Sequence, residues 1–395
     1  MLTVQKFGGS SVADAQKIAR VAGIIAGEHN KGSELVVVVS AQGDTTDELT
    51  EKALEINPRP PKRELDALLS AGEQVSASLM AMQLEKMGLP AVSLTGWQMG
   101  LLTDGSHGAA RIRAVSTERI RAELERGRIV IAAGFQGVDS SDDITTLGRG
   151  GSDTTAAALA AALHADKCQI YTDVEGVFNA DPRKIPGAYR LEEIGYDEML
   201  ELSSLGSQVL HNRSVELARH CGVELEVLSS SVPRPGTRVT DSSLVSEKAG
   251  ITGIAVDYGT ALVRVEDAGG GFEAAGRVFG ALAREKINVD MISISTGADG
   301  ACRVSFTVAG TDAGTARQAL ESAGFERLCV DQHTAKVSVV GSSLSSSDGV
   351  AAKLLAALCS HGIPVFAVST GELRISVLVP LDQAGASSLL FLKEK

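Results

Sequence analysis

The sequence predicts an open, mostly parallel α/β sheet covered by helices on both faces, followed by two small α+β modules. From residue 1 to about 228, short apolar runs rich in β-branched residues alternate with helical stretches. A segment dense in Ser, Pro and Gly, residues 229 to 250, then breaks the pattern. Beyond it, a strand, helix and strand pattern occurs twice. These observations predict one large α/β domain and a duplicated C-terminal region.

Continuous apolar runs predict the strands of the large domain. Strands are expected at LVVVVS (35 to 40), AVSLTG (91 to 96), IVIAAGFQG (129 to 137) and QIYTDV (169 to 174). Such continuous apolar runs are typical of a sheet that is buried on both faces. Helices are expected over 13 to 29, 63 to 87, 111 to 126, 152 to 165 and 207 to 221. In sheets of this kind, ligands bind beyond the carboxyl ends of the strands.

Matching strand segments predict an internal repeat in the C-terminal region. INVDMISIST (287 to 296) and CRVSFTV (302 to 308) correspond to IPVFAVST (363 to 370) and LRISVLV (373 to 379), about 71 to 76 residues later. A helix over 348 to 361 precedes the second pair. Two units of this size are expected to pack edge to edge as paired modules. A duplication that binds no ligand is the alternative.

The composition restricts the class of partner. The 395 residues carry a net charge of −12 without basic clusters, which argues against nucleic acid or an anionic membrane surface. No apolar stretch approaches the roughly 20 residues of a membrane span, and the N-terminus enters a strand directly, so we expect a cytoplasmic protein. The five cysteines and seven histidines are dispersed, without the spacing of a metal site.

The N-terminal strand ends in a stretch suited to an anion. VQKFGGSS places Lys6 just before Gly8, Gly9 and Ser10. Glycine lets the backbone approach a ligand closely, and free N–H groups beside a lysine suit phosphate. A plain strand-to-helix turn is the alternative.

A second stretch, TTLGRGGSDTT, suits a carboxylate. It places Arg149, two glycines, Ser152 and Asp153 directly before an Ala-rich helix. Ser152 or Asp153 would serve as a helix cap alone, but a cap does not require an arginine. The guanidinium matches a carboxylate, and the helix N-terminus adds N–H donors. The stretch therefore predicts a carboxylate-binding turn.

Three further stretches are weaker signals when taken singly. YTDVEGVFNADPRK (171 to 184) is a polar turn after a strand that suits a ribose and phosphates, SAQGDTTDELT (40 to 50) offers threonine hydroxyls, and Glu73 in LLSAGEQVSASLM interrupts an apolar helix face. Ordinary turns and a solvated charge are the alternatives. Together the five stretches offer groups for phosphate, carboxylate, ammonium and nucleotide.

In this order and spacing, VQKFGGSSV, SAQGDTTDEL, AGFQG with TTLGRGGSDTTA, and YTDVEGVFNADPR resemble the signature stretches of the aspartate kinase family. The C-terminal pair resembles the two ACT modules of that family. The resemblance spans nearly the whole chain. It implies an amino-acid-kinase αβα sandwich over residues 1 to 245 and ferredoxin-like ACT modules over 251 to 330 and 334 to 395.

The resemblance implies transfer of the γ-phosphoryl group of ATP, arriving with Mg²⁺, to the side-chain carboxylate of L-aspartate. The product would be 4-phospho-L-aspartate, on the route to lysine, threonine and methionine. The nucleophile is ionised at pH 7 because its reference pKa is about 4, so no general base is required. Catalysis is expected to depend on positioning and charge stabilisation. No protein ligand to a metal is named.

The roles of individual residues also follow from the resemblance. Lys6 and Asp153 are the catalytic candidates, with Asp153 orienting Lys6 or the metal shell. The aspartate-binding candidates are Thr46, Glu73, Arg149 and Ser152. The nucleotide-binding candidates are Lys6, Phe7, Gly8, Gly9, Ser10, Thr172, Asp173, Phe178, Asp181, Arg183 and Gln208.

The chain also departs from the family pattern. Relatives commonly have lysine where this chain has Gln208, and a neutral side chain there is expected to weaken ATP binding. The ACT helices begin without the usual Pro-Gly. Asp267, Asn288 and Asp290 are the effector-binding candidates, for lysine or threonine.

We further expect a homo-oligomer, because ACT modules expose sheet edges that pair with another copy. Two other functions remain open at this point: a kinase for another acidic amino acid such as glutamate, and an inert amino-acid sensor. Intact Lys6, Arg149, Ser152 and Asp153 argue against the sensor.

Overall fold

The computed structural model describes residues 1–206, 209–241, 250–266, 272–297, 302–342, 344 and 349–393. Contacts divide the chain into two compact units. The first comprises Met1–Val177 with Arg190–Glu247, and the second comprises Phe178–Tyr189 with Lys248–Lys395. No helix in the described ranges is both long and apolar enough to cross a membrane.

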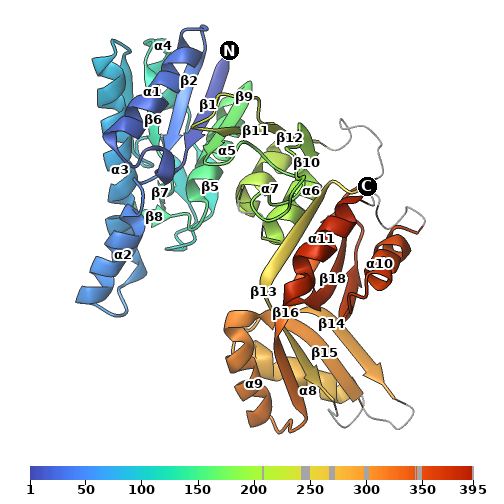
Figure 1. The fold of residues 1–395 in the computed structure, drawn as a ribbon. Coiled ribbons are helices and arrows are strands. Elements are labelled where there is room, and N and C mark those ends of the chain that lie inside the picture. Colours follow the sequence, from blue (N-terminus) through green and yellow to red (C-terminus); the bar gives the residue numbers. More distant parts are fainter. Residues whose placement is uncertain are drawn as a thin grey trace. The chain divides into compact units, whose positions relative to one another are not determined.

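The first unit is built on an eight-stranded sheet (Figure 1). Its order is β10 (Glu193–Gly195), β12 (Thr237–Thr240), β11 (Leu225–Ser229), β9 (Lys167–Thr172), β1 (Leu2–Phe7), β2 (Glu34–Val39), β6 (Ile129–Ala133) and β3 (Ala91–Leu94). Every neighbouring pair is parallel except β11 with β12. The predicted mostly parallel sheet is thus confirmed, with β1 near its centre.

Helices cover both faces of this sheet, as predicted. On one face, α1 (Ala15–His29) and α3 (Lys62–Lys86) pack against β1, β2 and β6 in a single hydrophobic core. On the other face, α5 (Gly151–Leu163) packs against β1 and β9, and α7 (Asn212–Cys221) packs against α5. Side chains alternate along a strand, so Phe7 enters the first core while Lys6 points toward α5. The remaining helices are α2 (Thr45–Ile56), α4 (Glu118–Glu125) and α6 (Tyr196–Ser204).

A small second sheet was not predicted. It has the order β5 (Ile112–Val115), β4 (Leu101–Thr103), β7 (Gln136–Val138) and β8 (Ile144–Thr146). The helix expected over 111 to 126 therefore begins only at Glu118, because its first residues form β5. The strand expected over 129 to 137 is divided between β6 and β7, because Phe135 adopts a φ of 69° and turns the chain. The helix expected from 207 begins at Asn212.

The second unit is built on one antiparallel six-stranded sheet. Its order is β14 (Asp290–Thr296), β15 (Cys302–Ala309), β13 (Gly253–Val265), β16 (Leu328–Val340), β18 (Arg374–Pro380) and β17 (Ala367–Thr370). Its helices are α8 (Phe272–Arg284), α9 (Ala313–Ser322), α10 (Val350–Ser360) and α11 (Ala384–Lys393). Two similar halves are present, as expected, but they share a single sheet.

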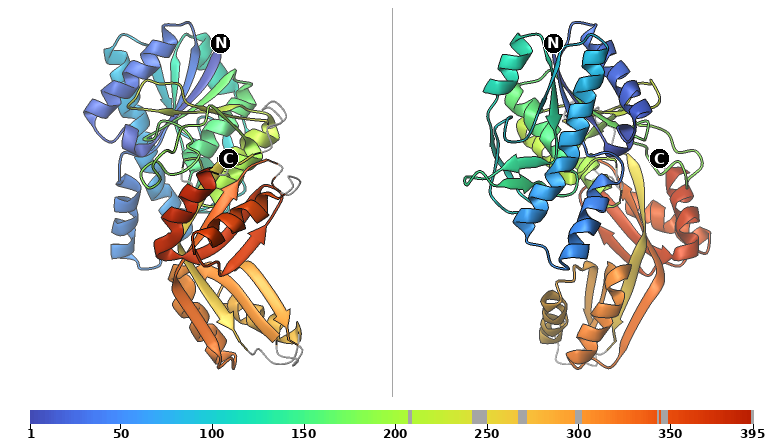
Figure 2. Two further views of the ribbon diagram at one scale, coloured as in Figure 1. Left: turned by 45° about the vertical axis from the view of Figure 1, so that its right-hand side comes forward. Right: turned by 90° about the vertical axis from the view of Figure 1, so that its left-hand side faces the viewer.

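The long strands β13 and β16 serve both halves. Val263 and Val265 of β13 belong to the core under α8 and α9, whereas Ile254 belongs to the core with α10 and α11. Figure 2 shows β13, in yellow, running past the red elements of the second core into the orange elements of the first. The expected boundary at 330 to 334 therefore lies inside β16.

The segment Phe178–Tyr189 packs with the second unit, although it follows β9 of the first in sequence. Ala180 and Ile185 lie in the core that holds α10 and α11. The N–H of Ile254 donates to the carbonyl of Asn179 at 2.7 Å. The domain expected over 1 to 245 therefore includes a segment that packs with the second unit.

The C-terminal helix completes the core of the second half. Phe391 is fully buried there, whereas Leu389 on the same helix is 37% exposed. We predict that Phe391→Ala lowers the free energy of unfolding of the second unit by about 3 to 5 kcal/mol, since a large cavity replaces the ring. Urea denaturation followed by circular dichroism measures this, with Leu389→Ala as control. Equal losses in the two variants would contradict the packing.

Candidate active site

A cavity of about 540 Å³ opens at the carboxyl ends of β1 and β2. It is lined by Lys6, Gly8, Gly9, Ser40, Ala41, Gly43, Thr46, Leu65, Asp66, Leu69, Glu73, Gly108, Phe135, Thr146, Gly148, Arg149, Gly150, Gly151, Ser152 and Asp153. The structure thus brings together residues from the four stretches around positions 6, 46, 73 and 149. All of these residues belong to the first unit.

Lys6 and Asp153 form an ion pair in this cavity. Lys6 Nζ lies 2.6 Å from Asp153 Oδ1, and each side chain is only 12% exposed. Lys6 is held by the central strand β1, and Asp153 lies in the first turn of α5. Two poorly hydrated charges compensate each other in this way, and the pair joins the strand end to the helix N-terminus.

Close backbone contacts shape the two glycine-rich turns. A Cβ on Gly9 would lie 2.5 Å from the carbonyl oxygen of Ala41, so only glycine lets the first turn pack against the end of β2. Gly150 has a φ of 68°, and a Cβ there would lie 2.2 Å from the Cβ of His211. Glycine at these positions is therefore a packing requirement, and it leaves backbone N–H groups near the cavity.

Arg149 directly precedes Gly150, yet its side chain is exposed. Within the described part of the chain, its guanidinium forms no hydrogen bond or ion pair. Ser152, three residues later, is only 7% exposed and lines the same cavity. A charged fork beside a helix N-terminus is well arranged to receive a carboxylate.

Glu73 is the acid of the cavity. It is 3% exposed, and its Oε1 accepts the backbone N–H of Ala41 at 3.1 Å. Among the described residues, Oε2 is buried without a hydrogen-bond partner. Burial raises the pKa of Glu73 to about 7, although the Ala41 N–H opposes the shift. A cationic group that entered the cavity would satisfy Oε2 and favour the ionised form.

The nucleotide candidates are placed less uniformly. Phe7 is buried and stacks on Tyr171 with ring centroids 4.5 Å apart, and it does not line the cavity. Ser10 is exposed and does not line the cavity. Thr172 ends β9 and donates its hydroxyl to Asp173 at 3.0 Å. Phe178, Asp181 and Arg183 belong to the second unit, and Gln208 lies outside the described residues.

Sequence reasoning missed two polar groups near these turns. The Ser11 hydroxyl donates to Ser230 Oγ at 2.8 Å, and the N–H of Ser230 donates to the Thr172 carbonyl at 2.9 Å. The sequence predicts only a domain boundary at the serine run, but its beginning connects the ends of β1, β9 and β11. Asp66 is the second missed group. It lines the cavity and lies about two helical turns before Glu73 on α3. This spacing of seven residues indicates that the two side chains share one helix face.

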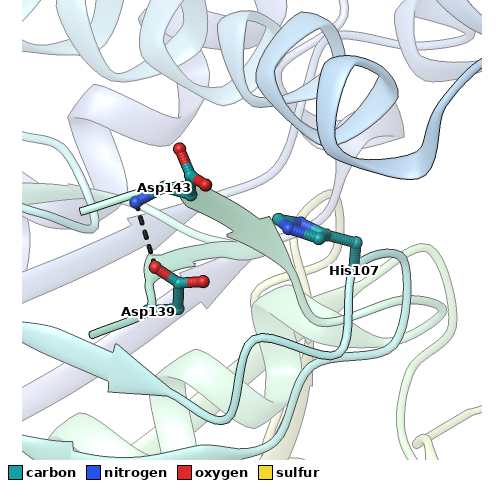
Figure 3. Close-up of side chains that lie close together, drawn as sticks. All are labelled: His107, Asp139 and Asp143. Carbon is teal, nitrogen blue, oxygen red and sulfur yellow. Dashed lines mark hydrogen bonds between the residues drawn. The ribbon is translucent and has the colours of Figure 1, made fainter. Parts of the chain in front are cut away.

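His107, Asp139 and Asp143 form a further cluster, with one potential ligand atom from each lying within 4.8 Å of the others (Figure 3). Each carboxylate already has donors. Arg63 donates to Asp143 at 2.6 Å, and Asp139 accepts the N–H groups of Ser141 and Asp143. Nothing in this geometry assigns a metal to the cluster.

Of the effector candidates, Asn288 is exposed and Asp290 is partly buried. Burial alone would raise the pKa of Asp290, but the hydrogen bond from Lys336 at 2.8 Å and nearby positive charge lower it overall. Asp267 lies outside the described residues.

Comparisons with known proteins identify the family of this chain. The amino acid kinase family matches residues 1–229, and the ACT domain matches residues 270–323 and 337–387. Aspartokinase 2 of Bacillus subtilis is 47% identical over 382 residues, covering 96% of this chain and 93% of the relative. The chain belongs to the aspartokinase family. Its activity is that of an aspartate kinase, an ATP-dependent phosphotransferase of amino-acid biosynthesis.

Other aspartokinases extend the likeness. The aspartokinase of Corynebacterium glutamicum is 46% identical over 98% of this chain and 94% of its own. E. coli aspartokinase III in complex with aspartate and ADP has a TM-score of 0.77 at 25% identity, covering 100% of this chain and 99% of its own. The same enzyme with lysine and aspartate has a TM-score of 0.80 at 27% identity, covering 99% of each chain. The aspartate kinase fold with its ACT region, inferred from sequence, is therefore confirmed.

The raised pKa of Glu73 generates a prediction about stability. Folded Glu73 binds its proton more tightly than the unfolded chain does, so its contribution to stability falls as pH rises from about 4.5 to about 7. Glu73→Gln removes this loss. We expect the variant to gain about 3 kcal/mol relative to wild type between pH 4 and pH 8 in the ligand-free protein. Denaturant titrations at several pH values measure the difference, with exposed Glu64→Gln as control. A gain that is independent of pH would contradict the assignment.

Proposed function

We propose that the cavity holds the reacting groups of both substrates, with the phosphoryl group at Lys6 and aspartate between Arg149 and Glu73. One observation supports this most strongly. Lys6, Asp153, Arg149 and Glu73 come from distant parts of the chain, yet they line one cavity at the carboxyl ends of parallel strands. That is the place where sheets of this kind bind ligands.

The reaction needs a cation more than a base. The aspartate side chain is ionised at neutral pH, and its approach to an anionic phosphoryl group is opposed by charge repulsion. Lys6 reduces that repulsion and stabilises the charge on the transferring group. Asp153, 2.6 Å from Lys6 Nζ, fixes the direction of the ammonium and accepts no proton from the nucleophile. Gly8 and Gly9 add backbone donors beside Lys6.

Aspartate is held at both ends in this proposal. Arg149 and Ser152 bind its carboxylates, and Glu73 with Thr46 completes the pocket around its ammonium. The free Oε2 of Glu73 and the unpaired guanidinium of Arg149, within the described residues, support this orientation. Bringing the ammonium to Glu73 also returns the pKa of that carboxyl toward its ordinary range.

ATP would occupy the remaining strand ends. Thr172 and Asp173 at the end of β9 are proposed for the nucleotide by family resemblance. Phe178, Asp181 and Arg183 belong to the second unit and Gln208 lies outside the described residues, so for these four the nucleotide role stays a prediction from the resemblance. The ADP in the E. coli relative supports ATP as the phosphoryl donor. Mg²⁺ would be held mainly by phosphates and water, and the Asp153 carboxylate is an oxygen donor that lines this cavity beside Lys6. When bound, the ion neutralises phosphate charge.

Feedback control and assembly are assigned to the second unit. The lysine-bound relative supports an amino-acid effector, lysine or threonine, with Asp290 and Asn288 as candidate contacts. A homo-oligomer is supported by the sheet edges, because β14 exposes Ile292 by 52% and Ile294 by 37%, and β17 exposes Val368 by 44%. A cytoplasmic location remains part of the proposal, as for other enzymes of amino-acid synthesis.

The catalytic assignment predicts separate effects for two cations. ADP release from ATP and Mg²⁺ should require L-aspartate. Lys6→Ala should lower kcat by about a thousandfold or more, because charge stabilisation is lost. Arg149→Ala should instead raise the KM for aspartate at least about tenfold, with little change in the KM for ATP. A coupled assay of ADP measures both. Unchanged kinetics in either variant would contradict that residue's role.

The regulatory assignment predicts inhibition through the second unit. Lysine or threonine, alone or together, should lower turnover of the wild type. Asp290→Asn should raise the half-inhibitory concentration about tenfold without changing the uninhibited rate. Asp331→Asn, on β16 of the same sheet, is the control. If Asp290→Asn responds exactly like the control, Asp290 has no part in effector binding.

A further inference from the structure

We infer that Asp66 is a positioning residue that fixes the Arg149 turn at a set distance from Glu73, and so makes the pocket fit aspartate. This inference rests on the proposed role of Arg149 in binding the substrate carboxylate. Asp66 and Glu73 both lie on α3 and line the cavity. They are seven residues apart, which is close to two helical turns and places them on one face.

Asp66 is a buried hydrogen-bond acceptor with four donors. It is 1% exposed. Its Oδ2 accepts the backbone N–H groups of Gly108 at 2.9 Å and Thr146 at 3.0 Å, and its Oδ1 accepts the Thr146 hydroxyl at 2.6 Å. His107 Nδ1 lies 3.0 Å from Oδ2. Because an ionised carboxylate only accepts, His107 donates from Nδ1. The carboxylate therefore ties α3 to two segments, 107–108 and 146, that lie 41 to 80 residues away.

Those two segments lie against each other directly before Arg149. The N–H of Ala110 donates to the carbonyl of Thr146 at 2.9 Å. Gly148 has a φ of 76°, and a Cβ on it would lie 3.0 Å from the carbonyl oxygen of Gly108. The backbone of 146–148 is thus packed on 108–110, and Asp66 holds both. Any shift of Asp66 would therefore move the backbone of 146–148, and with it Arg149, which follows directly in the chain.

Arg213 of α7 holds the same segments from a second direction. Its guanidinium donates to the carbonyl of Leu147 and to the carbonyl of Ala110, the latter at 2.8 Å. Burial lowers the pKa of Arg213, but an arginine stays charged at neutral pH. The backbone before Arg149 is therefore fixed by an anion on α3 and a cation on α7, while the Arg149 side chain remains exposed.

The consequence concerns the length of the substrate. Glu73 receives the ammonium and the Arg149 turn receives a carboxylate, and α3 holds both through its own residues. Aspartate and glutamate differ by one methylene, so discrimination between them needs a rigid distance between the two sites. Figure 3 shows the loop that carries His107 beside Asp139 and Asp143.

Two substitutions of Asp66 separate hydrogen bonding from charge. In Asp66→Asn the amide oxygen can accept the donors of Oδ2, and the amide nitrogen can donate to the Thr146 hydroxyl. In Asp66→Ala all four interactions are lost. We expect Asp66→Ala to raise the KM for aspartate about tenfold, to leave the KM for ATP within about twofold, and to reduce the preference for aspartate over glutamate in kcat/KM. Asp66→Asn should stay within about threefold of wild type.

Glu64→Ala, which removes an exposed carboxylate of the same helix, is the control. Arg213→Met provides a second test should Asp66→Ala fail to fold, and it should show the same selective rise in the KM for aspartate. Equal rises in both KM values, or an unchanged preference for aspartate in folded Asp66→Ala and Arg213→Met, would overturn the inference. If Arg149→Ala alone alters the KM for aspartate, the proposed function survives and this inference fails.

Discussion

The ion pair between Lys6 and Asp153 is the interaction on which the rest of the site depends. It joins the end of the central strand β1 to the first turn of α5, with 2.6 Å between the charged atoms. Removing two charges from water is costly unless they compensate each other, so the strand end and the helix N-terminus must meet at this point. The glycine turns on either side, after β1 and before α5, are then brought to one cavity. The proposed phosphoryl and carboxylate sites thereby become neighbours.

Around this pair, the cavity keeps opposite charges in separate places. Arg149 is exposed and unpaired among the described residues, while Glu73 is buried with one free carboxylate oxygen. The buried Glu73 oxygen is costly without a partner, and the Arg149 guanidinium is unpaired among the described residues. An amino acid with an ammonium at one end and a carboxylate at the other would provide a partner for both. Under the proposed assignment, the charges of this cavity are complementary to those of aspartate. Helix α3 and the segments that it holds keep these two groups at a defined separation.

Much of this could be predicted from sequence, because the informative signals are local. The apolar runs predict the parallel sheet. The short stretches whose composition indicates ligand binding contain Lys6, Glu73, Arg149 and Asp153. The small sheet was missed because its strands are three or four residues long. The seven-residue spacing from Glu73 indicates that Asp66 shares its helix face, but the proposed role of Asp66 depends on partners up to 80 residues away, which no local pattern reveals. The continuous sheet of the ACT region was also hidden, since β13 and β16 each extend through two cores that sequence treats as separate modules.

The most direct test of this account is a double-mutant cycle on the central ion pair. It uses Lys6→Met, Asp153→Asn and the double variant, and it measures kcat for aspartate-dependent ADP formation. If Asp153 acts by orienting Lys6, the double variant should be no more than about threefold slower than Lys6→Met alone, because the second change removes nothing further. If the two losses multiply, Asp153 acts independently of Lys6, and the ion pair is not the basis of the site.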